Sequence, residues 1–361
     1  MKQFYSLLRV ICLLCPLILS SFFATCDDEP SNPPPRPIDS TSHSFTFQRD
    51  TIAVFGSAIN DIFAISENDV WTVGQFYVKD STGVVKNDPY NAAHWDGSRW
   101  EYFRIMFTLN YGNGDVFKAD KSEIDAVFSP SPTEVWFSCA VGVTRLRNNV
   151  WEEITSATVR SFGGANKIWG SGSTDLYFAS GSGIVQHWDG TTFRKIPSGY
   201  TADLEDIWGA SKDEIYIAAA DRTMASGYYG FLLRIENGQS KGVDYWGNSV
   251  MTCVWGMKGK WYASGCDRNI YMKEGTTWKP ILHLNQCVAQ LRGTSLNNIF
   301  FSAEGSILVH YNGSTFKEIV SENDVNGFII PKAIACVGKK VFLIGRGSLP
   351  VVIRGTQQPI K

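Results

Sequence analysis

The chain has 361 residues, 44% of them apolar and 13% aromatic, with a formal net charge of −2. This apolar content is enough for a large core and excludes a chain that is disordered throughout. The sequence has no long run of Lys or Arg, so it lacks the clustered cations that bind a phosphate backbone. We therefore expect no nucleic-acid partner.

Residues 1–25 have the pattern of an export signal. Lys2 and Arg9 make its start positive, and residues 10–24 are apolar but shorter than the roughly 20 residues of a membrane span. The sequence Phe23-Ala24-Thr25-Cys26 resembles a bacterial lipobox. The resemblance implies that Cys26 is acylated and becomes the first residue of a lipid-anchored chain. The alternative is an ordinary signal peptide and a secreted protein.

Residues 26–43 are interpreted as a tether between this anchor and the folded part. Asp27-Asp28-Glu29 resembles the acidic signal that sends lipoproteins of Bacteroidota-like bacteria to the cell surface. The Pro-rich residues 30–39 favour an extended conformation of about 3 Å per residue. We expect a protein of the bacterial outer membrane or cell surface that meets the membrane through its lipid alone.

The remaining residues, 44–361, form a repeat with a period of about 40 residues, which indicates a repeat architecture. The clearest copies begin at Ile168-Trp169-Gly170, Ile207-Trp208-Gly209 and Val254-Trp255-Gly256. Weaker copies begin at Ile62, Val127, Leu291 and Ile334. Each copy contains four short β patterns, and turns such as Asp189-Gly190 are typical of tight hairpins. Seven such copies predict an all-β, seven-bladed β-propeller of four-stranded blades.

The last copy is too short to supply its own fourth strand. Residues 44–50 alternate apolar and polar side chains ahead of the first copy, as an exposed strand does. We predict that this N-terminal segment forms the outer strand of the last blade and closes the ring. The alternative is a six-bladed ring with two additional strands.

The anchors, together with turns such as His187-Trp188-Asp189-Gly190, resemble bacterial secreted and lipoprotein β-propeller repeat proteins. The architecture is similar to that of kelch and Asp-box propellers, without their motifs. Asp96-Gly97-Ser98-Arg99-Trp100 is one residue shorter than an Asp-box turn, so a sialidase is not supported. The resemblance implies a fold and leaves the function open.

Two columns of the repeat are assigned structural roles. His94, His187 and His310 share one position on the third strand, so the symmetry of the ring keeps them apart and they form no metal site. The Trp residues of the anchors are expected to pack between blades.

The column two residues before the anchor is expected at the mouth of the central channel. Its polar members are Asp61, Lys167, Asp206 and Gln290. Two carboxylates three blades apart, with no His or nucleophile beside them, make a poor catalytic set. We assign no catalytic residue, metal or cofactor.

Four long connections are predicted to leave one face of the ring, at residues 75–91, 104–124, 220–230 and 239–250. Aromatic and charged loop residues of this kind suit recognition. The candidate binding residues are Phe76, Tyr77, Tyr90, Tyr111, Arg222, Tyr228, Tyr229, Tyr245 and Trp246. We expect a non-catalytic surface lipoprotein that binds a protein or glycan. The alternatives are a secreted polysaccharide hydrolase or lyase and a structural envelope component.

An exported chain permits disulfides. Cys253 and Cys266 flank one hairpin and are expected at opposed positions, and Cys287 competes for either of them. Cys139 and Cys336 are the candidates for an unbridged cysteine.

Overall fold

The structure is a computed structural model that describes residues 40–110, 116–140, 142–154, 164–222, 229–245, 249–305, 307–321 and 329–360. The export signal, Cys26, most of the tether and the candidate residues Tyr111, Tyr228 and Trp246 lie outside the described residues. In the described part of the chain, no helix has the length and apolar character needed to cross a membrane.

The described chain is all-β, as predicted, with seven four-stranded antiparallel sheets and one separate hairpin. Blade 1 comprises β2 (Ala58–Ser66), β3 (Asp69–Phe76), β4 (Tyr90–Trp95) and β5 (Trp100–Phe103). Blade 2 comprises β8 (Ile124–Ser131), β9 (Glu134–Cys139), β10 (Gly142–Arg147) and β11 (Val150–Ile154). Between them lies the hairpin of β6 (Phe107–Asn110) and β7 (Val116–Ala119). Blade 3 comprises β12 (Lys167–Gly172), β13 (Asp175–Ala179), β14 (Ile184–Trp188) and β15 (Phe193–Pro197).

The other four blades follow the same order along the chain. Blade 4 comprises β16 (Asp203–Ser211), β17 (Glu214–Asp221), β18 (Tyr229–Glu236) and β19 (Gln239–Tyr245). Blade 5 comprises β20 (Met251–Met257), β21 (Lys260–Gly265), β22 (Asn269–Glu274) and β23 (Thr277–His283). Blade 6 comprises β24 (Val288–Ser295), β25 (Asn298–Ala303), β26 (Ile307–Tyr311) and β27 (Phe316–Val320). Blade 7 comprises β28 (Ile330–Val337), β29 (Lys340–Arg346), β30 (Pro350–Gln357) and β1 (Phe45–Thr51).

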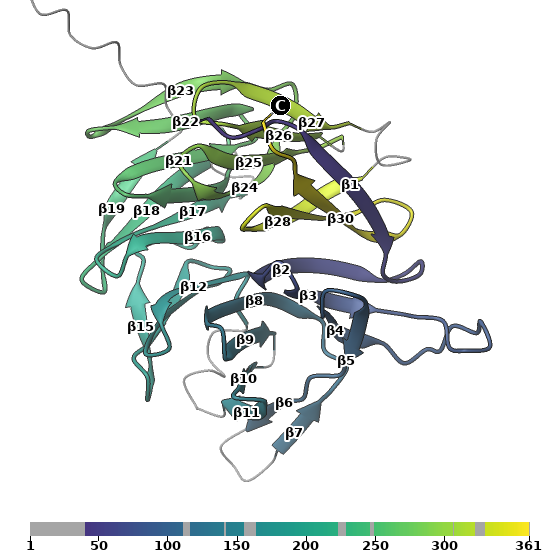
Figure 1. The fold of residues 1–361 in the computed structure, drawn as a ribbon. Coiled ribbons are helices and arrows are strands. Elements are labelled where there is room, and N and C mark those ends of the chain that lie inside the picture. The colour runs from purple at the N-terminus through teal and green to yellow at the C-terminus, as the bar shows by residue number, and fades with distance from the viewer. Residues whose placement is uncertain are drawn as a thin grey trace, which may run out of the picture. The chain divides into compact units, whose positions relative to one another are not determined.

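The first strands of the blades form a closed ring. Each contacts the first strand of the next blade, in the order β2, β8, β12, β16, β20, β24 and β28, and β28 contacts β2 again (Figure 1). The N-terminal strand β1 closes the last blade, as predicted, with Phe47 opposite Gly355 in the antiparallel pair with β30. The prediction of seven blades is therefore confirmed, and the six-bladed alternative is wrong.

The core of the propeller lies between adjacent blades. Every residue of the second strands β9 and β25 is buried, because both sides of each second strand pack against neighbouring blades. The Trp-Gly anchors explain how closely the blades approach: a Cβ atom at Gly209 would collide with the ring of Trp169, and one at Gly293 with Trp255. The expected packing role of the anchor Trp residues is confirmed.

The third-strand histidines are structural, as expected. His94 lies 2.8 Å from Asp69, and His187 lies 2.6 Å from Asp175, in each case an acidic residue at the start of the second strand. His310 meets Asn298 at 2.8 Å, and burial together with His43 lowers its pKa to about 3. Each imidazole therefore ties the third strand of a blade to its second strand.

The antiparallel order of the strands gives the ring two different faces. Connections after the second and fourth strands leave on one face, which includes residues 77–89, 104–110 and 116–123; we call it the insertion face. The tight turns after the first and third strands, such as residues 67–68 and 96–99, lie on the other side, which we call the turn face.

Candidate functional site

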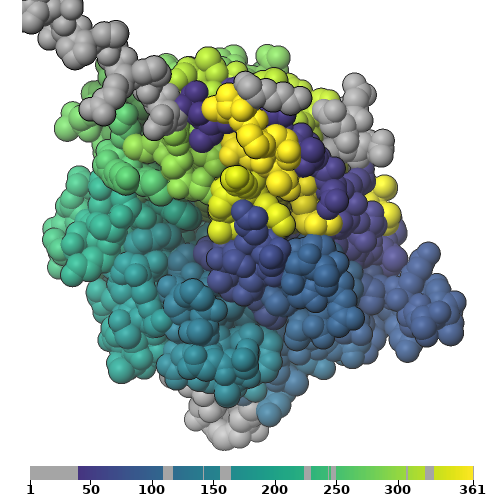
Figure 2. Space-filling view, viewed as in Figure 1, coloured from purple at the N-terminus to yellow at the C-terminus, as the bar shows by residue number. Residues whose placement is uncertain are grey.

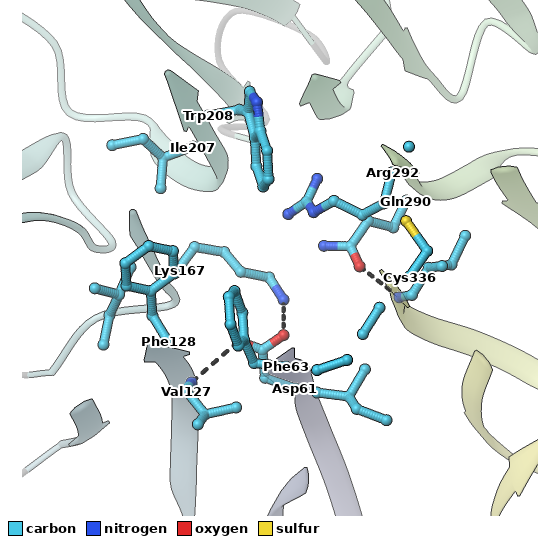
Figure 3. Close-up of a pocket in the computed structure, with 16 residues that line it drawn as sticks. Asp61, Phe63, Val127, Phe128, Lys167, Ile207, Trp208, Gln290, Arg292 and Cys336 are labelled. Carbon is cyan, nitrogen blue, oxygen red and sulfur yellow. Dashed lines mark hydrogen bonds and ion pairs between the residues drawn. The ribbon is translucent and has the colours of Figure 1, made fainter. Parts of the chain in front are cut away.

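The central channel is closed by charged residues of the column two before each anchor. Asp61 of blade 1 forms an ion pair with Lys167 of blade 3 (Figure 3). The same carboxylate accepts a hydrogen bond of 3.1 Å from the backbone N–H of Val127 in blade 2. Asp61 thus joins three blades, and together with Lys167 it lines a small axial cavity of about 100 Å³.

A second ion pair closes the other side of the channel. Asp206 of blade 4 is only 1% exposed. Its carboxylate accepts hydrogen bonds from both terminal nitrogens of Arg292 in blade 6, at 2.7 and 2.8 Å. The backbone N–H of Val254, in blade 5, donates to the same carboxylate at 3.1 Å. The guanidinium of Arg292 also lies 5.0 Å from the ring of Trp208, which lines the axial cavity (Figure 3).

Each ion pair joins two blades that are separated by one intervening blade. The intervening blade has a small side chain in the same column. Blade 2, between Asp61 and Lys167, has only Ala126 in the column, and blade 5 has Cys253 in the same column. Gln290 joins two adjacent blades: its side-chain oxygen, in blade 6, accepts a hydrogen bond of 2.6 Å from the backbone N–H of Ile334 in blade 7. The column thus fastens the blades to one another around the axis.

Sequence reasoning missed Arg292. It occupies the position of the anchor Trp in the sixth copy, where Leu291-Arg292-Gly293 was taken as a weakened anchor. The available signal was a charged side chain in a column that is aromatic in the first five copies.

The two axial carboxylates are unsuited to acid–base chemistry as they stand. Each already accepts hydrogen bonds from a cation and from a backbone N–H, so both oxygens of each carboxylate have a donor. Among the described residues, no group of three or more His, Cys, Asp or Glu side chains could hold a metal ion.

Above the axial ion pairs, the channel widens on the insertion face into a cavity of about 510 Å³, which we call the mouth. All seven blades contribute to its wall, mostly through the start of the first strand or the end of the second. Its charged residues are Glu123, Asp125, Lys167, Glu205, Arg222, Glu304 and Lys332. The mouth thus offers charges of both signs to a ligand, above a floor made of paired charges.

Asp125 is the most perturbed carboxyl in the mouth. Burial, together with the neighbouring charge of Glu123, raises its pKa to about 6, although Lys332 acts in the opposite direction. Asp125 therefore ionises as the pH rises through 6, and it adds a negative charge to the mouth beside the carboxylate of Glu123.

The two long connections that flank the outer strands of blade 1 are held to one another by ion pairs. Asp88 forms ion pairs with Arg104 at 2.5 Å and with Lys121 at 2.6 Å. At the tip of residues 77–89, Asp80 accepts hydrogen bonds from the backbone of Thr82 and Val84 at 2.9 and 3.1 Å. This tip projects from the edge of the ring as the blue segment on the right of Figure 2.

The structure separates the candidate binding residues into different environments. The expectation for Phe76 is wrong, because it ends strand β3 with no exposed surface. Tyr90 begins β4 and is half-buried, with the guanidinium of Arg104 4.7 Å from its ring. Tyr77, also half-buried, and the exposed Tyr229 remain available on the insertion face.

Two further candidates belong to blade 4. Arg222 lines the mouth and forms an ion pair with Glu205. Tyr245 ends strand β19, opposite Phe231. Residues 239–245 are therefore the fourth strand of the blade, and the expectation that all of residues 239–250 form a long loop is wrong.

Exposed apolar side chains on the insertion face were also missed. Phe55, between β1 and β2, is 84% exposed, and Ile330 at the start of β28 is 51% exposed and lines the mouth. Val84 is exposed at the tip of residues 77–89. The run Ala53-Val54-Phe55 before a Gly was visible in the sequence, but its exposure depends on where the ring closes.

The expected disulfide set resolves into one bridge, Cys266 to Cys287. Cys253 is opposite Ser264 in the hairpin, so the expected opposition of Cys253 and Cys266 is wrong. The two-residue turn at Lys258 and Gly259 pairs Met257 with Lys260, and the unbroken register from there places Ser264, not Cys266, opposite Cys253. The bridge joins blade 5 to the start of blade 6 and lines the mouth.

No protein-family model matches the sequence, and no curated protein matches it. Solved structures are similar in fold. YCF48 bound to D1 peptide has a TM-score of 0.61 at 12% identity, over 86% of this chain and 95% of that one. YCF48 from Cyanidioschyzon merolae has a TM-score of 0.57 at 10% identity, over 84% and 98%. The WD40 β-propeller domain of Doa1 has a TM-score of 0.63 at 11% identity, over 87% and 98%. Likeness at this identity shows the fold, and the chain is a seven-bladed β-propeller.

Proposed function

We propose that the protein is a surface lipoprotein whose propeller binds a segment of a protein partner in the mouth on the insertion face. The mouth itself is the observation that carries the proposal. Its volume of about 510 Å³ lies in the range of specific ligand sites, roughly 300–1,000 Å³, and it is walled by all seven blades. Such a volume admits a few side chains of an extended segment.

The charge of the mouth favours a basic side chain on the partner. Burial raises the pKa of Asp125 most, and the nearby negative charge of Glu123 raises it further. The positive charge of Lys332 therefore does not fully neutralise the two carboxylates. Arg222 is already engaged by Glu205. A Lys or Arg of the partner placed between Glu123 and Asp125 relieves their repulsion and gains charge-assisted hydrogen bonds.

Apolar side chains on the insertion face, of which Ile330 lines the mouth, support a protein partner. Phe55, Ile330 and Tyr229 are exposed on the insertion face, as is Val84 at the tip of the blade 1 loop. Exposed aromatic and aliphatic groups around a polar pocket are typical of protein interfaces. Among the similar structures, YCF48 is seen bound to a peptide, which is consistent with this use of the fold.

The anchoring part of the proposal rests on residues 23–39. Acylation of Cys26 and the Pro-rich tether would hold the propeller away from the membrane while leaving it attached. Mass spectrometry of the mature N-terminus tests this directly. We expect residue 26 to be first and to carry acyl chains, and an unmodified Cys26 would refute the anchor.

The alternatives are an enzyme acting on polysaccharide and a structural envelope component. The commitment of Asp61 and Asp206 to cations argues against the first. A neutral glycan could donate hydroxyl hydrogen bonds to Asp125 but would not neutralise its charge. A protein segment can use both the charges of the mouth and the exposed apolar side chains of the insertion face, so we prefer it.

A random peptide library displayed on phage tests the proposal. We expect selection on the full mature protein to enrich peptides with Lys or Arg near an apolar residue. Affinity measured by fluorescence polarisation should fall at least tenfold in Glu123→Gln/Asp125→Asn. Glu318→Gln, on the outer strand β27, is the matched control and should bind normally. Failure to enrich any sequence, or binding confined to a glycan array, would overturn the proposal.

A further inference from the structure

The axial cavity is a second candidate site and is distinct from the mouth. On β2, Asn60 lines the mouth and Ala64 lines the axial cavity. On β28, Lys332 and Cys336 are divided in the same way. Each first strand runs from the insertion face to the turn face, so the axial cavity lies on the turn side of the floor. The proposed function does not use it.

Gln290 directs a buried amide donor into this cavity. The residue is only 3% exposed. Its side-chain oxygen accepts the hydrogen bond from Ile334, so the nitrogen Nε2 is the other end of the amide. Figure 3 shows Nε2 pointing toward the centre of the cavity, and it donates to no residue in the described part of the chain. Buried donors normally have an acceptor, so a ligand atom with a lone pair fits at this point.

Two cations reach the same point. Lys167, from blade 3, uses one of the three hydrogens of its ammonium group to bind Asp61. Arg292, from blade 6, donates to Asp206 through Nη1 and Nη2, and its Nε has no acceptor among the described residues. Figure 3 shows the ammonium and the guanidinium both extending toward the amide nitrogen of Gln290. Hydrogen-bond donors of three side chains therefore converge on the cavity.

The cavity has donors in excess and a net positive lining. Both oxygens of Asp61 already accept hydrogen bonds, from Lys167 and from the backbone of Val127. Asp206 binds Arg292 from outside and does not line the cavity. The charged lining is thus one carboxylate, Asp61, and two cations, Lys167 and Arg292, a net of +1. Such a lining selects an acceptor that carries negative charge, because charge-assisted hydrogen bonds are the stronger ones.

The other walls of the cavity are apolar. Phe63, Phe128 and Trp208 line it, together with Ile168 and Ile207. Its volume is about 100 Å³, which is room for roughly three water-sized groups at about 30 Å³ each. The cavity is partly open to solvent, so a small solute can enter it. The space fits a carboxylate with a short hydrocarbon chain and is too small for a sugar ring.

We infer that the axial cavity binds a short-chain monocarboxylate, such as acetate or propionate. The carboxylate accepts hydrogen bonds from Lys167, Gln290 and Arg292, and the hydrocarbon chain lies against the aromatic walls. A halide ion would leave those walls without an apolar partner. A dicarboxylate would place its second charge against them, and burying an unpaired charge is costly.

Saturation-transfer difference NMR tests the inference, with propionate as the probe and the full mature protein as the receptor. We expect saturation of the aromatic protons to reach the methyl group of propionate. Propionamide has the same shape without the charge, and we expect it to bind at least about tenfold more weakly.

Gln290→Glu is the most selective variant. It keeps the acceptor for Ile334 and the size of the side chain, but it replaces the free donor by a carboxylate. Propionate affinity should fall at least about tenfold. Gln239→Glu makes the same chemical change on the exposed strand β19 and should bind propionate within about twofold of the wild type.

A second pair of variants changes the space instead of the charge. Ala64→Leu fills the cavity and should weaken propionate binding at least tenfold, whereas Ala64→Ser leaves it open and should stay within threefold of the wild type. Thermal melting checks that both variants are folded. Glu123→Gln/Asp125→Asn alters the mouth and should leave propionate binding unchanged, which separates this site from the proposed function.

The inference would be overturned if the wild type transferred no saturation to propionate, or if Gln290→Glu bound it as tightly as the wild type. Two competition results would also overturn it. One is displacement of propionate by chloride at the concentration at which acetate displaces it, which would show an unselective anion site. The other is equal displacement by propionamide, which would show that the charge of the ligand is not recognised.

Discussion

Glu205 and Asp206 are neighbours on strand β16, yet the fold gives them opposite environments. Asp206 points into the ring, is 1% exposed and is held by Arg292 and by the backbone of blade 5. Glu205 lines the open mouth and pairs with Arg222, whose side chain is 43% exposed. One step along a strand therefore separates a residue that holds the blades together from a residue that faces a ligand.

The same division applies around the ring. Asp61, Lys167 and Gln290 make contacts with neighbouring or next-neighbouring blades, even though Lys167 and Gln290 also border the mouth. Asp125 and Lys332, one residue earlier in their own copies, belong to the wall of the mouth. Polar character alone does not distinguish the two columns. Position relative to the anchor does, because it sets the depth at which a side chain enters the channel.

The largest effect is expected at the floor. Asp206→Ala leaves the guanidinium of Arg292 and the N–H of Val254 buried without their acceptor. Such a loss costs about 3–5 kcal/mol of unfolding free energy. Denaturant unfolding should show this decrease, with Glu205→Ala as the matched neighbour within about 0.5 kcal/mol of the wild type.

The double variant Asp206→Leu/Arg292→Met sharpens this comparison. Removing both charges avoids the unpaired guanidinium, so we expect it to recover more than half of the loss. Equal destabilisation by Glu205→Ala and Asp206→Ala would show that the floor and the mouth do not differ as described.

An intermediate effect is expected for the disulfide at the edge of the mouth. The bridge from Cys266 to Cys287 spans 21 residues of sequence. Its loss in Cys287→Ser should lower the unfolding free energy by about 2–4 kcal/mol. A reducing agent should destabilise the wild type by a similar amount and leave the variant unchanged. A variant that remains sensitive to reductant would contradict this bridge.

The smallest effect is expected at Asp125, and it depends on pH. Its pKa is about 6 in the folded chain against an ordinary value of 3.8, so the folded state binds the proton more tightly than the unfolded state. Stability from this group is therefore present at low pH and is lost as the pH rises through 6.

Asp125→Asn has no such proton to lose. Relative to the wild type, the variant should be more stable at pH 7 by on the order of 1 kcal/mol, and the difference should shrink as the pH falls to 5. Thermal melts at the two pH values measure it. A difference that grows on acidification would contradict the environment described for Asp125.

The sequence was sufficient to predict the architecture because the same four-strand pattern occurs in seven copies. The spacing of anchors and turns predicted the blades, and the alternation in residues 44–50 predicted the closing strand that β1 forms. The mouth was harder to predict, since its wall is assembled from single residues of seven blades. The predicted boundaries between strand and loop were wrong at Phe76 and at residues 239–245, which lie in strands. The length of a connection does not show where strand pairing ends.

Two features depended on three-dimensional register. The exact turn of one hairpin, at Lys258 and Gly259, places Cys253 opposite Ser264, and the partner of Cys266, Cys287, comes from the start of the next blade. The pairing of Arg292 with Asp206 crosses a whole blade, so it appears only when the ring is closed.

Hydrogen–deuterium exchange of the full mature protein, with and without the tightest peptide from the library, tests the central claim most directly. If the mouth is the binding site, the peptide should slow exchange at residues 121–125 and 203–205. Residues 131–134 and 171–175, on the turn face, should be unaffected. Protection confined to the turn face, or bound peptide with no protection around the mouth, would contradict the account.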